Sequence, residues 1–226
     1  SRRIFRVTAE ETGRGAFLLG GWVGRERELV PLRARWREAI GTGDSPRPRP
    51  GVALLQGAVG CGKSRLLDRF ASEIAASGAI VARGTCREGM DGFEPAISVL
   101  HDLDVTRHLG ASPVPEEFAP YRPALLRLLG LAGPSAEELH GRDADREDLG
   151  IQEAFAQTIL LSSRQRPVLV LIDDVQWADE GTVRLLGYLV RTLSTGVDRP
   201  VLVCLAMRPD VPAWLNEGLL DWQGQP

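Results

Sequence analysis

Apolar runs and amphipathic segments alternate along most of this chain of 226 residues. Four runs are apolar at nearly every position, each short enough for one buried strand, and they cover residues 52–56, 79–86, 167–174 and 200–207. Apolar residues recur at helical spacing in residues 25–40, 64–77, 149–165 and 179–193. Continuously apolar strands that alternate with helices predict an α/β domain whose mostly parallel sheet is covered by helices on both faces.

The remaining segments suggest how the domain is organised. Residues 3–8 alternate apolar and polar positions like a short strand, inside an N-terminal extension of residues 1–20. Residues 95–165 look mainly helical and are interpreted as an insertion between two of the strands. We expect the main domain to occupy residues 21–210, and residues 211–226 to form a truncated connection.

A glycine-rich loop joins the first apolar run to the following helix. Residues 57–64 read GAVGCGKS and match the pattern G-x-x-x-x-G-K-[ST]. Glycines let the backbone wrap so that its N–H groups face phosphate oxygens, and the helix directs its positive end at the same anion. A chance glycine-rich turn is the alternative, but a buried strand before the loop and a helix after it meet the motif's structural condition. The predicted nucleotide-binding residues are Gly57, Ala58, Val59, Gly60, Cys61, Gly62, Lys63, Ser64 and Arg65.

Three side chains of this loop have individual expectations. Lys63 is the only lysine among the 27 lysine and arginine residues, and a compact ammonium reaches between phosphate oxygens where a planar guanidinium fits poorly. The Ser64 hydroxyl is expected to bind Mg²⁺. Cys61 lies near a helix N-terminus and a cation, which predicts a reactive thiol that nucleotide would protect. The alternative for Cys61 is a small filler whose sulfur points into the fold.

Carboxylates follow the most apolar run at its end. Asp173 and Asp174 come directly after VLVLI, and a strand end in such a sheet faces the ligand crevice. An enzyme with a phosphate-binding loop of the pattern found at residues 57–64 (a P-loop) needs a carboxylate at this strand end to hold Mg²⁺. We therefore assign Asp173 as a ligand of the metal. Asp174 is the candidate general base, with capping of the turn as the alternative. Arg208 ends the next run and would contact the γ-phosphate, unless it only begins an exposed Pro-Asp turn.

Charge and composition argue against several other functions. The net charge of −3 and the pI of about 5.7 disfavour a nucleic-acid-binding surface across the domain. No apolar stretch approaches the roughly 20 residues that span a bilayer, so no membrane contact is expected. The 3 cysteines are far apart and odd in number, which predicts neither a disulfide framework nor a metal-ligand cluster and suits a reducing cytoplasm.

Four stretches together resemble a known family. They are WVGREREL at 22–29, LLQGAVGCGKSRLL at 54–67, VLVLIDDVQWAD at 168–179 and VLVCLAMRPD at 201–210. They look like the AAA-type ATPase domain of the STAND class of signalling NTPases. This domain occurs in large ATP-binding regulators of the LuxR family and in related multidomain cyclases and kinases. The resemblance implies a three-layer P-loop NTPase fold over residues 21–210.

The resemblance also implies roles for residues outside the loop. Val23 and Arg25 would line the adenine pocket, with a simple lead-in to the first helix as the alternative. Trp177 and Asp179 would pack and cap the turn after the acidic strand. The family often has Thr where this chain has Ala206, so one polar γ-phosphate contact would be missing.

The family's strand order, counted from the P-loop strand, is 2-3-4-1-5. We expect 2-3-4-1 here, because the fifth strand and the helical or winged-helix lid would follow the last residue, as in an excised domain. The P-loop strand would then be an open apolar edge, which residues 3–8 would cover. Phe93 and Pro95 match the family pattern without a purpose that the sequence explains.

These features favour a nucleotide-operated switch. ATP binding with Mg²⁺ and slow hydrolysis to ADP would set this domain against a lid, an effector and a sensor in the same polypeptide. By resemblance alone the output is transcriptional control, with room for nucleotide-dependent self-association and without direct nucleic-acid binding by this domain. A catalytic NTPase or kinase with rapid turnover, and a nucleotide-dependent scaffold without useful hydrolysis, are the alternatives.

Overall fold

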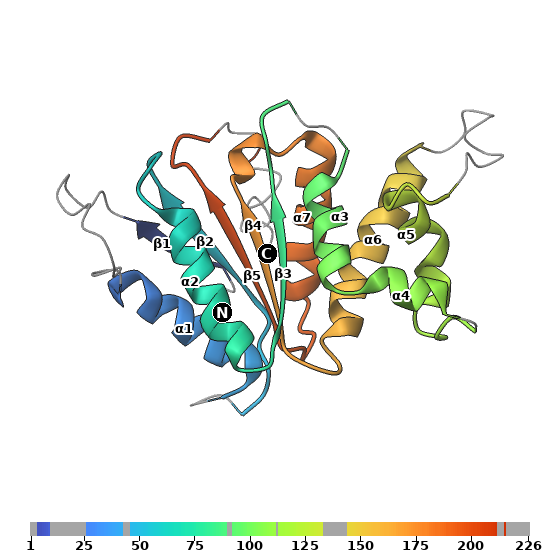
Figure 1. Cartoon of the computed structure of the whole chain (residues 1–226), viewed down its shortest axis with the longest axis horizontal. Coiled ribbons are helices and arrows are strands. Elements are labelled where there is room, and N and C mark those ends of the chain that lie inside the picture. Colours follow the sequence, from blue (N-terminus) through green and yellow to red (C-terminus); the bar gives the residue numbers. More distant parts are fainter. Residues whose placement is uncertain are drawn as a thin grey trace.

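A single five-stranded sheet forms the centre of the molecule (Figure 1). The computed structural model describes residues 4–9, 26–42, 46–89, 92–111, 113–132, 144–211 and 215. The strands are β1 (Ile4–Ala9), β2 (Gly51–Gly57), β3 (Ile80–Thr85), β4 (Val168–Asp173) and β5 (Val201–Met207). Their order is β1-β2-β5-β4-β3, and every neighbouring pair is parallel. The predicted α/β fold is confirmed.

The order of the strands agrees with the expectation for the four core strands. The family numbers its strands from the one that precedes the glycine-rich loop, which is β2 in this structure. Its strands 2, 3, 4 and 1 are therefore β3, β4, β5 and β2, and they lie in that order in the sheet. β1 pairs with β2 from Ile4 opposite Val52 to Ala9 opposite Gly57. The N-terminal strand therefore covers the edge that β2 would otherwise expose, as predicted.

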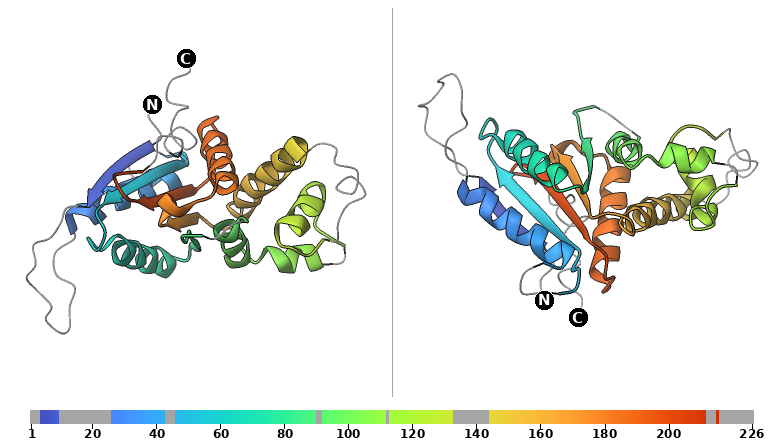
Figure 2. Two further views of the ribbon diagram at one scale, coloured as in Figure 1. Left: turned by 90° about the horizontal axis from the view of Figure 1, so that it is seen from above. Right: turned by 60° about the horizontal axis from the view of Figure 1, so that its bottom comes forward.

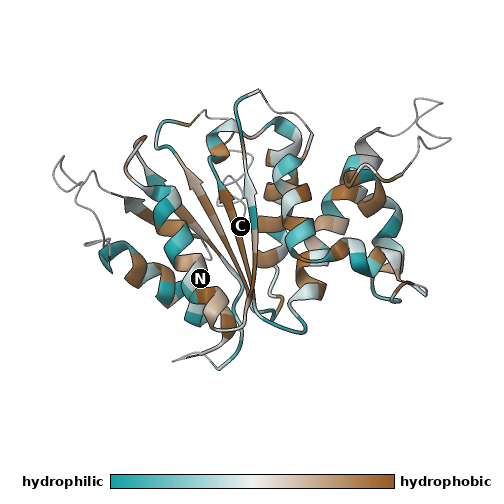
Figure 3. Cartoon of the chain, viewed as in Figure 1, coloured by the Kyte–Doolittle hydropathy of each residue, from teal (hydrophilic) through white to brown (hydrophobic). Residues whose placement is uncertain are grey.

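Helices cover both faces of the sheet and give three layers. One face carries α1 (Glu26–Ile40) and α2 (Lys63–Ala76), and the other carries α7 (Glu180–Ser194) with α3 (Glu94–Asp102) and α6 (Ala144–Ser162) in the same apolar cluster. Figure 2 shows α2 and α7 on opposite sides of the sheet. In β2, Ala53 and Leu55 pack with α1 and α2, whereas Val52 and Leu54 pack in the cluster of α7. Burial on both faces explains why the central strands β4 and β5 are apolar at nearly every position (Figure 3).

The segment between β3 and β4 is mostly helical, as predicted. Besides α3 and α6 it contains α4 (Val105–Gly110), a 3₁₀ turn (Ala119–Tyr121) and α5 (Arg122–Leu128). α4 and α5 lie beyond the edge of the sheet, and α5 packs on α6 (Figure 1). The helix α6 begins at Ala144, earlier than the predicted 149. Val23, Arg25 and most of the connection after Val211 lie outside the described residues.

The outer edge of β3 is closed by α3. The Arg83 N–H points away from β4 and donates to Asp102 Oδ2 at 2.8 Å. Gly84 allows close approach, because a Cβ there would lie 2.4 Å from the Pro95 carbonyl oxygen. Pro95 is buried in the first turn of α3, so its contact with β3 gives it the packing role that the sequence does not reveal.

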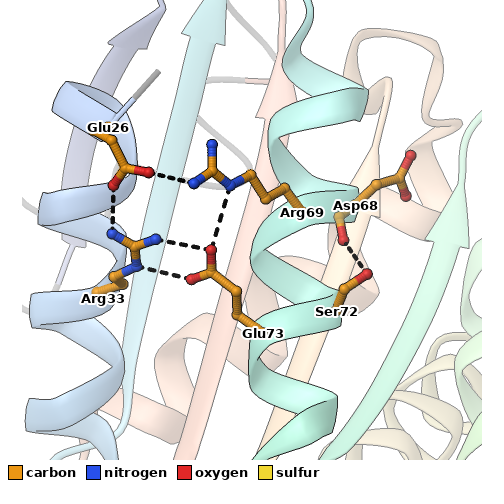
Figure 4. Close-up of polar contacts among 6 residues, drawn as sticks. All are labelled: Glu26, Arg33, Asp68, Arg69, Ser72 and Glu73. Atoms are coloured by element: carbon orange, nitrogen blue, oxygen red, sulfur yellow. Dashed lines mark hydrogen bonds and ion pairs between the residues drawn. The ribbon is translucent and has the colours of Figure 1, made fainter. Parts of the chain in front are cut away.

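A partly exposed ion cluster joins the outer sides of α1 and α2 (Figure 4). Arg33 donates from Nε and Nη2 to the two carboxylate oxygens of Glu73, both at 2.8 Å, and from Nη1 to Glu26 at 2.6 Å. Arg69 completes the ring by pairing with Glu26 and with Glu73. The hydrogen bonds from Arg33 lower the pKa of both carboxyl groups. The cluster connects α1 to the helix that follows the glycine-rich loop.

Candidate nucleotide site

The glycine-rich loop lies between the end of β2 at Gly57 and the start of α2 at Lys63. Gly60 and Gly62 have φ angles of 76° and 86°, a left-handed conformation that side chains other than glycine adopt at a cost. The Cys61 N–H donates to the Ala58 carbonyl at 3.3 Å and closes a turn. The shape of the loop is therefore set by its main chain, which explains the glycines of the motif.

Lys63 is buried and holds its ammonium against the loop itself. Its Nζ donates to the Gly57 carbonyl at 2.9 Å and to the Ala58 carbonyl at 3.1 Å, and the side chain is 7% exposed. Within the part of the chain that the structure describes, no carboxylate forms an ion pair with Lys63. A buried cation that only neutral carbonyls contact is poorly compensated and favours an incoming anion.

The start of α2 adds a second attraction for an anion. Gly62 is the N-cap and makes no side-chain cap, and the first turn holds no acidic residue. The N–H groups at this end are thus left to a ligand, and the helix contributes partial positive charge. Val59, Gly60, Ser64 and Arg65 are exposed around the loop.

The Cys61 thiol is not open to water, which corrects the expectation of a reactive cysteine. The residue is 6% exposed and belongs to the apolar cluster of α1 and α2, so the alternative of an inward-pointing filler describes it. Cys86 and Cys204 are also buried. Burial raises the pKa of the Cys204 thiol to about 12. Burial, followed by the nearby carboxylates of Asp179, Asp174 and Asp173, raises the pKa of Cys86 to about 12.

The acidic strand end lies at the same edge of the sheet as the glycine-rich loop. β2, β5 and β4 are parallel neighbours, so their carboxyl ends meet there, with the end of β5 between the other two (Figure 1). Asp173 Oδ1 accepts from the Asp174 N–H at 2.8 Å. Asp174 has φ 54°, which Asp tolerates better than most residues. The Asp174 side chain makes no cap hydrogen bond to the following 3₁₀ turn (Val175–Trp177).

Gln176 connects the ends of β4 and β5, and sequence reasoning assigned it no role. Its Nε2 donates to Asp174 Oδ1 at 2.8 Å, and its Oε1 accepts from the Arg208 N–H at 3.1 Å. The Arg208 guanidinium lies over the Trp177 ring, 5.0 Å from its centroid. The only signal in the sequence was an amide two residues after Asp174 in a turn of otherwise apolar character.

Asp179 ties the loop after β3 to the start of α7. Its Oδ1 accepts from the Thr182 N–H at 2.7 Å, which makes Asp179 the N-cap of α7, and its Oδ2 accepts from the Gly92 N–H at 3.0 Å. Burial alone would raise the pKa of this carboxyl, but the hydrogen bonds outweigh burial and hold the pKa below its ordinary value. The Phe93 ring packs at Gly181, so Phe93 closes the same loop onto α7.

The donor set suits Mg²⁺. Ser64 and Asp173 offer a hydroxyl and a carboxylate oxygen, which are ligands of the hard type that Mg²⁺ prefers. Across the described ranges, no three His, Cys, Asp or Glu side chains gather into a cluster that could enclose an ion.

A buried strand, a glycine loop with an uncompensated lysine, a positive helix start and neighbouring carboxylates define a P-loop nucleotide-binding domain. The family model for the AAA ATPase domain matches residues 21–204, and the chain belongs to this family. Membership implies nucleotide binding, usually with Mg²⁺, and ATP hydrolysis as the general activity of the family.

The chain is also similar to an uncharacterized protein of Rhizobium meliloti (strain 1021), with 26% identity over 236 residues. The match covers 95% of this chain but 22% of that protein, so the chain spans less than a quarter of its relative. None of the helices described here is both long and apolar enough to cross a membrane.

Proposed function

We propose that this chain is the ATP-binding, slowly hydrolysing switch domain of a multidomain signalling protein. The observation that carries the proposal is the buried Lys63 ammonium, which has only loop carbonyls as described partners and stands at the positive start of α2. Such a site is complementary to the phosphates of a nucleotide. ATP and ADP are the ligands expected from the family.

Each residue of the site has a distinct task in this proposal. Lys63 and the N–H groups of the loop bind the phosphates, and Ser64 and Asp173 would hold Mg²⁺, which offsets phosphate charge when bound. Asp174 accepts a proton from the attacking water at its carboxylate. Arg208 leaves the Trp177 ring to contact the γ-phosphate. Val23 and Arg25, outside the described residues, would contact the adenine.

Two features support slow turnover rather than fast catalysis. Position 206 is a buried alanine, which offers no polar contact to a γ-phosphate. The Arg208 guanidinium lies on Trp177, so this cation must move before it can stabilise developing charge. We therefore expect turnover far below the enzyme median of about 10 s⁻¹. A rapid NTPase or kinase, and a scaffold without useful hydrolysis, are the competing functions.

The role in signalling rests on resemblance and on length. The four family stretches are typical of STAND-class domains in regulators of the LuxR type, and the Rhizobium relative is several times longer than this chain. We propose a cytoplasmic protein in which nucleotide state sets this domain against a lid, an effector and a sensor, with transcriptional control as the output. Self-association that depends on nucleotide is compatible with this arrangement.

Calorimetry of ATP binding with Mg²⁺ tests the core of the proposal. Lys63→Ala should weaken binding by about 10- to 100-fold or more, because hydrogen bonds to charged groups contribute about 1.5–3 kcal/mol each. Arg166→Ala, which removes a cation from an exposed position, is the matched control and should bind like the wild type. Equal affinity of Lys63→Ala and wild type would overturn the assignment. Steady-state phosphate release then separates a slow switch from a fast enzyme and from an inert scaffold.

A further inference from the structure

One side chain joins the ends of the two strands that carry the candidate acidic and basic residues. Gln176 lies in the 3₁₀ turn after β4 and donates from Nε2 to Asp174 Oδ1 at 2.8 Å. The same amide accepts, through Oε1, the N–H of Arg208 at the end of β5 at 3.1 Å. Gln176 is partly buried, so both hydrogen bonds are shielded from full competition with water.

The orientation of this amide is fixed by chemistry. A main-chain N–H can only donate, so the group that faces Arg208 must be the amide oxygen. The amide nitrogen then necessarily faces Asp174, whose ionised carboxylate can only accept. Rotating the amide by half a turn would place oxygen against carboxylate and nitrogen against N–H, and both hydrogen bonds would be lost. Gln176 is therefore held in one state by its two neighbours.

The backbone around Gln176 is constrained on both sides as well. Asp174 has a left-handed φ of 54°, a conformation that the surrounding structure must maintain. Trp177 follows Gln176 and lies under the Arg208 guanidinium. The main chain of Arg208 is thus bound by Gln176 and its side chain by Trp177, both from the turn that presents Asp174.

We propose that Gln176 is a positioning residue for ATP hydrolysis, which orients the Asp174 carboxylate and couples it to Arg208. This inference rests on the proposed function, because it assumes that Asp174 acts on the attacking water. The contact is with the main-chain N–H of Arg208, so a shift of that main chain would alter the geometry at Oε1, and the same amide would transmit the shift to the Asp174 carboxylate.

Two substitutions of Gln176 separate the contacts. Gln176→Glu keeps an acceptor for the Arg208 N–H but replaces the donor that faces Asp174 with a carboxylate oxygen, so the contact with Asp174 is lost and like-charge repulsion is added. Gln176→Leu removes both contacts. For each variant of the full chain we would measure kcat and KM for Mg²⁺–ATP under single-turnover and steady-state conditions, ATP affinity by calorimetry, and folding by circular dichroism. Gln165→Leu, at an exposed position beyond α6, is the matched control.

We expect both Gln176 variants to lower kcat by about 10-fold or more, as for loss of one hydrogen bond to a charged group. KM and ATP affinity should stay within about 2-fold, because the phosphate-binding groups are untouched. In an Asp174→Asn background, the same substitutions should lower kcat no further, since the group that they orient is already lost. A purely structural role would not produce this dependence on Asp174.

A wild-type kcat in Gln176→Glu would overturn the inference, and so would equal losses in the wild-type and Asp174→Asn backgrounds. If Gln176→Leu fails to fold, Gln176→Glu carries the test alone, because it preserves the contact with β5. Failure of the proposed function has a different signature, namely a folded wild-type chain that does not bind ATP in calorimetry.

Discussion

The glycine-rich loop and the acidic turn (residues 173–179) lie at one edge of the sheet, but they are built in different ways. In the loop, the shape comes from main-chain turns at Gly60 and Gly62, and Lys63 donates to two carbonyl groups of the loop. In the acidic turn, side chains form the hydrogen bonds to other segments. Gln176 accepts from the end of β5, and Asp179 accepts from the loop after β3. One region is made by a local run of sequence and the other by contacts between distant segments.

This difference determines how each region should respond to mutation. A substitution in a main-chain turn lowers the free energy of unfolding through backbone strain, and this cost is local and moderate. A substitution in a region assembled from distant segments stops one segment from fitting another, so stabilisation is lost at every contact between them. Substitutions that introduce strain in one region and misfit in another should therefore destabilise the protein to different degrees.

The largest effect on stability is expected for Gly84→Ala. The added Cβ would lie 2.4 Å from the Pro95 carbonyl oxygen, so α3 and the loop that Asp179 holds must shift. We expect a loss of about 3 kcal/mol in the free energy of unfolding, as for overpacking against backbone. Gly60→Ala in the glycine-rich loop meets no atom within 4 Å, and its left-handed φ should cost only about 1–2 kcal/mol.

Urea unfolding of both variants measures this contrast. Gly110→Ala is the control, because a Cβ there meets nothing and no strained φ is involved. It should be neutral or slightly stabilising. If Gly60→Ala costs more than Gly84→Ala, backbone strain in the loop outweighs the misfit between β3 and α3.

Asp179→Ala should have an intermediate effect. It removes the cap of α7 and the acceptor for the Gly92 N–H, and loss of a helix cap costs about 1–2 kcal/mol. The pKa of Asp179 is lowered in the folded protein. Its carboxylate therefore contributes stability above the unfolded-state value of about 3.9, and this contribution is lost as pH falls through the lower folded-state pKa.

Thermal or chemical unfolding across pH tests this prediction. The difference in stability between wild type and Asp179→Ala should be constant near neutrality and shrink below about pH 4. Asp198→Ala, at an exposed position in the loop before β5, should show neither effect. A difference that does not change with pH would assign the stabilisation to packing rather than to the carboxylate.

The smallest effect is expected for Arg33→Gln in the partly exposed cluster between α1 and α2. The Arg33 side chain is 30% exposed and Glu73 34% exposed, and ion pairs at such positions contribute about 0–1 kcal/mol. The contribution should fall further at 1 M salt, where the screening length is about 3 Å. Arg37→Gln on the same helix, also exposed, serves as control. A loss of unfolding free energy that is larger than this range and does not change with salt would contradict the prediction, because it would show that these ion pairs stabilise the protein strongly without being buried.

The parts of the structure that follow local rules were predictable from the sequence. The core strand order follows from apolar runs and family stretches, and the loop follows from its octamer. Even the docking of β1 could be expected, because β2 needed a neighbour. The sequence could not decide between the two directions of the Cys61 side chain, since the α1–α2 cluster that receives it is formed by distant residues. Gln176 contacts a residue 32 positions away, and no local pattern reveals such a contact.

The pairing of β1 with β2 has a mechanical consequence. The six pairs from Ile4 opposite Val52 to Ala9 opposite Gly57 are parallel, and the hydrogen bonds of a parallel pair are evenly spaced and slanted across the strands. Tension on the chain ahead of Ile4 therefore loads the pairs together in shear, whereas a hairpin pulled from its open end would unzip one pair at a time. β2 ends in the loop that holds Lys63, so a force on the N-terminal segment is delivered directly to the strand that supports the phosphate-binding loop.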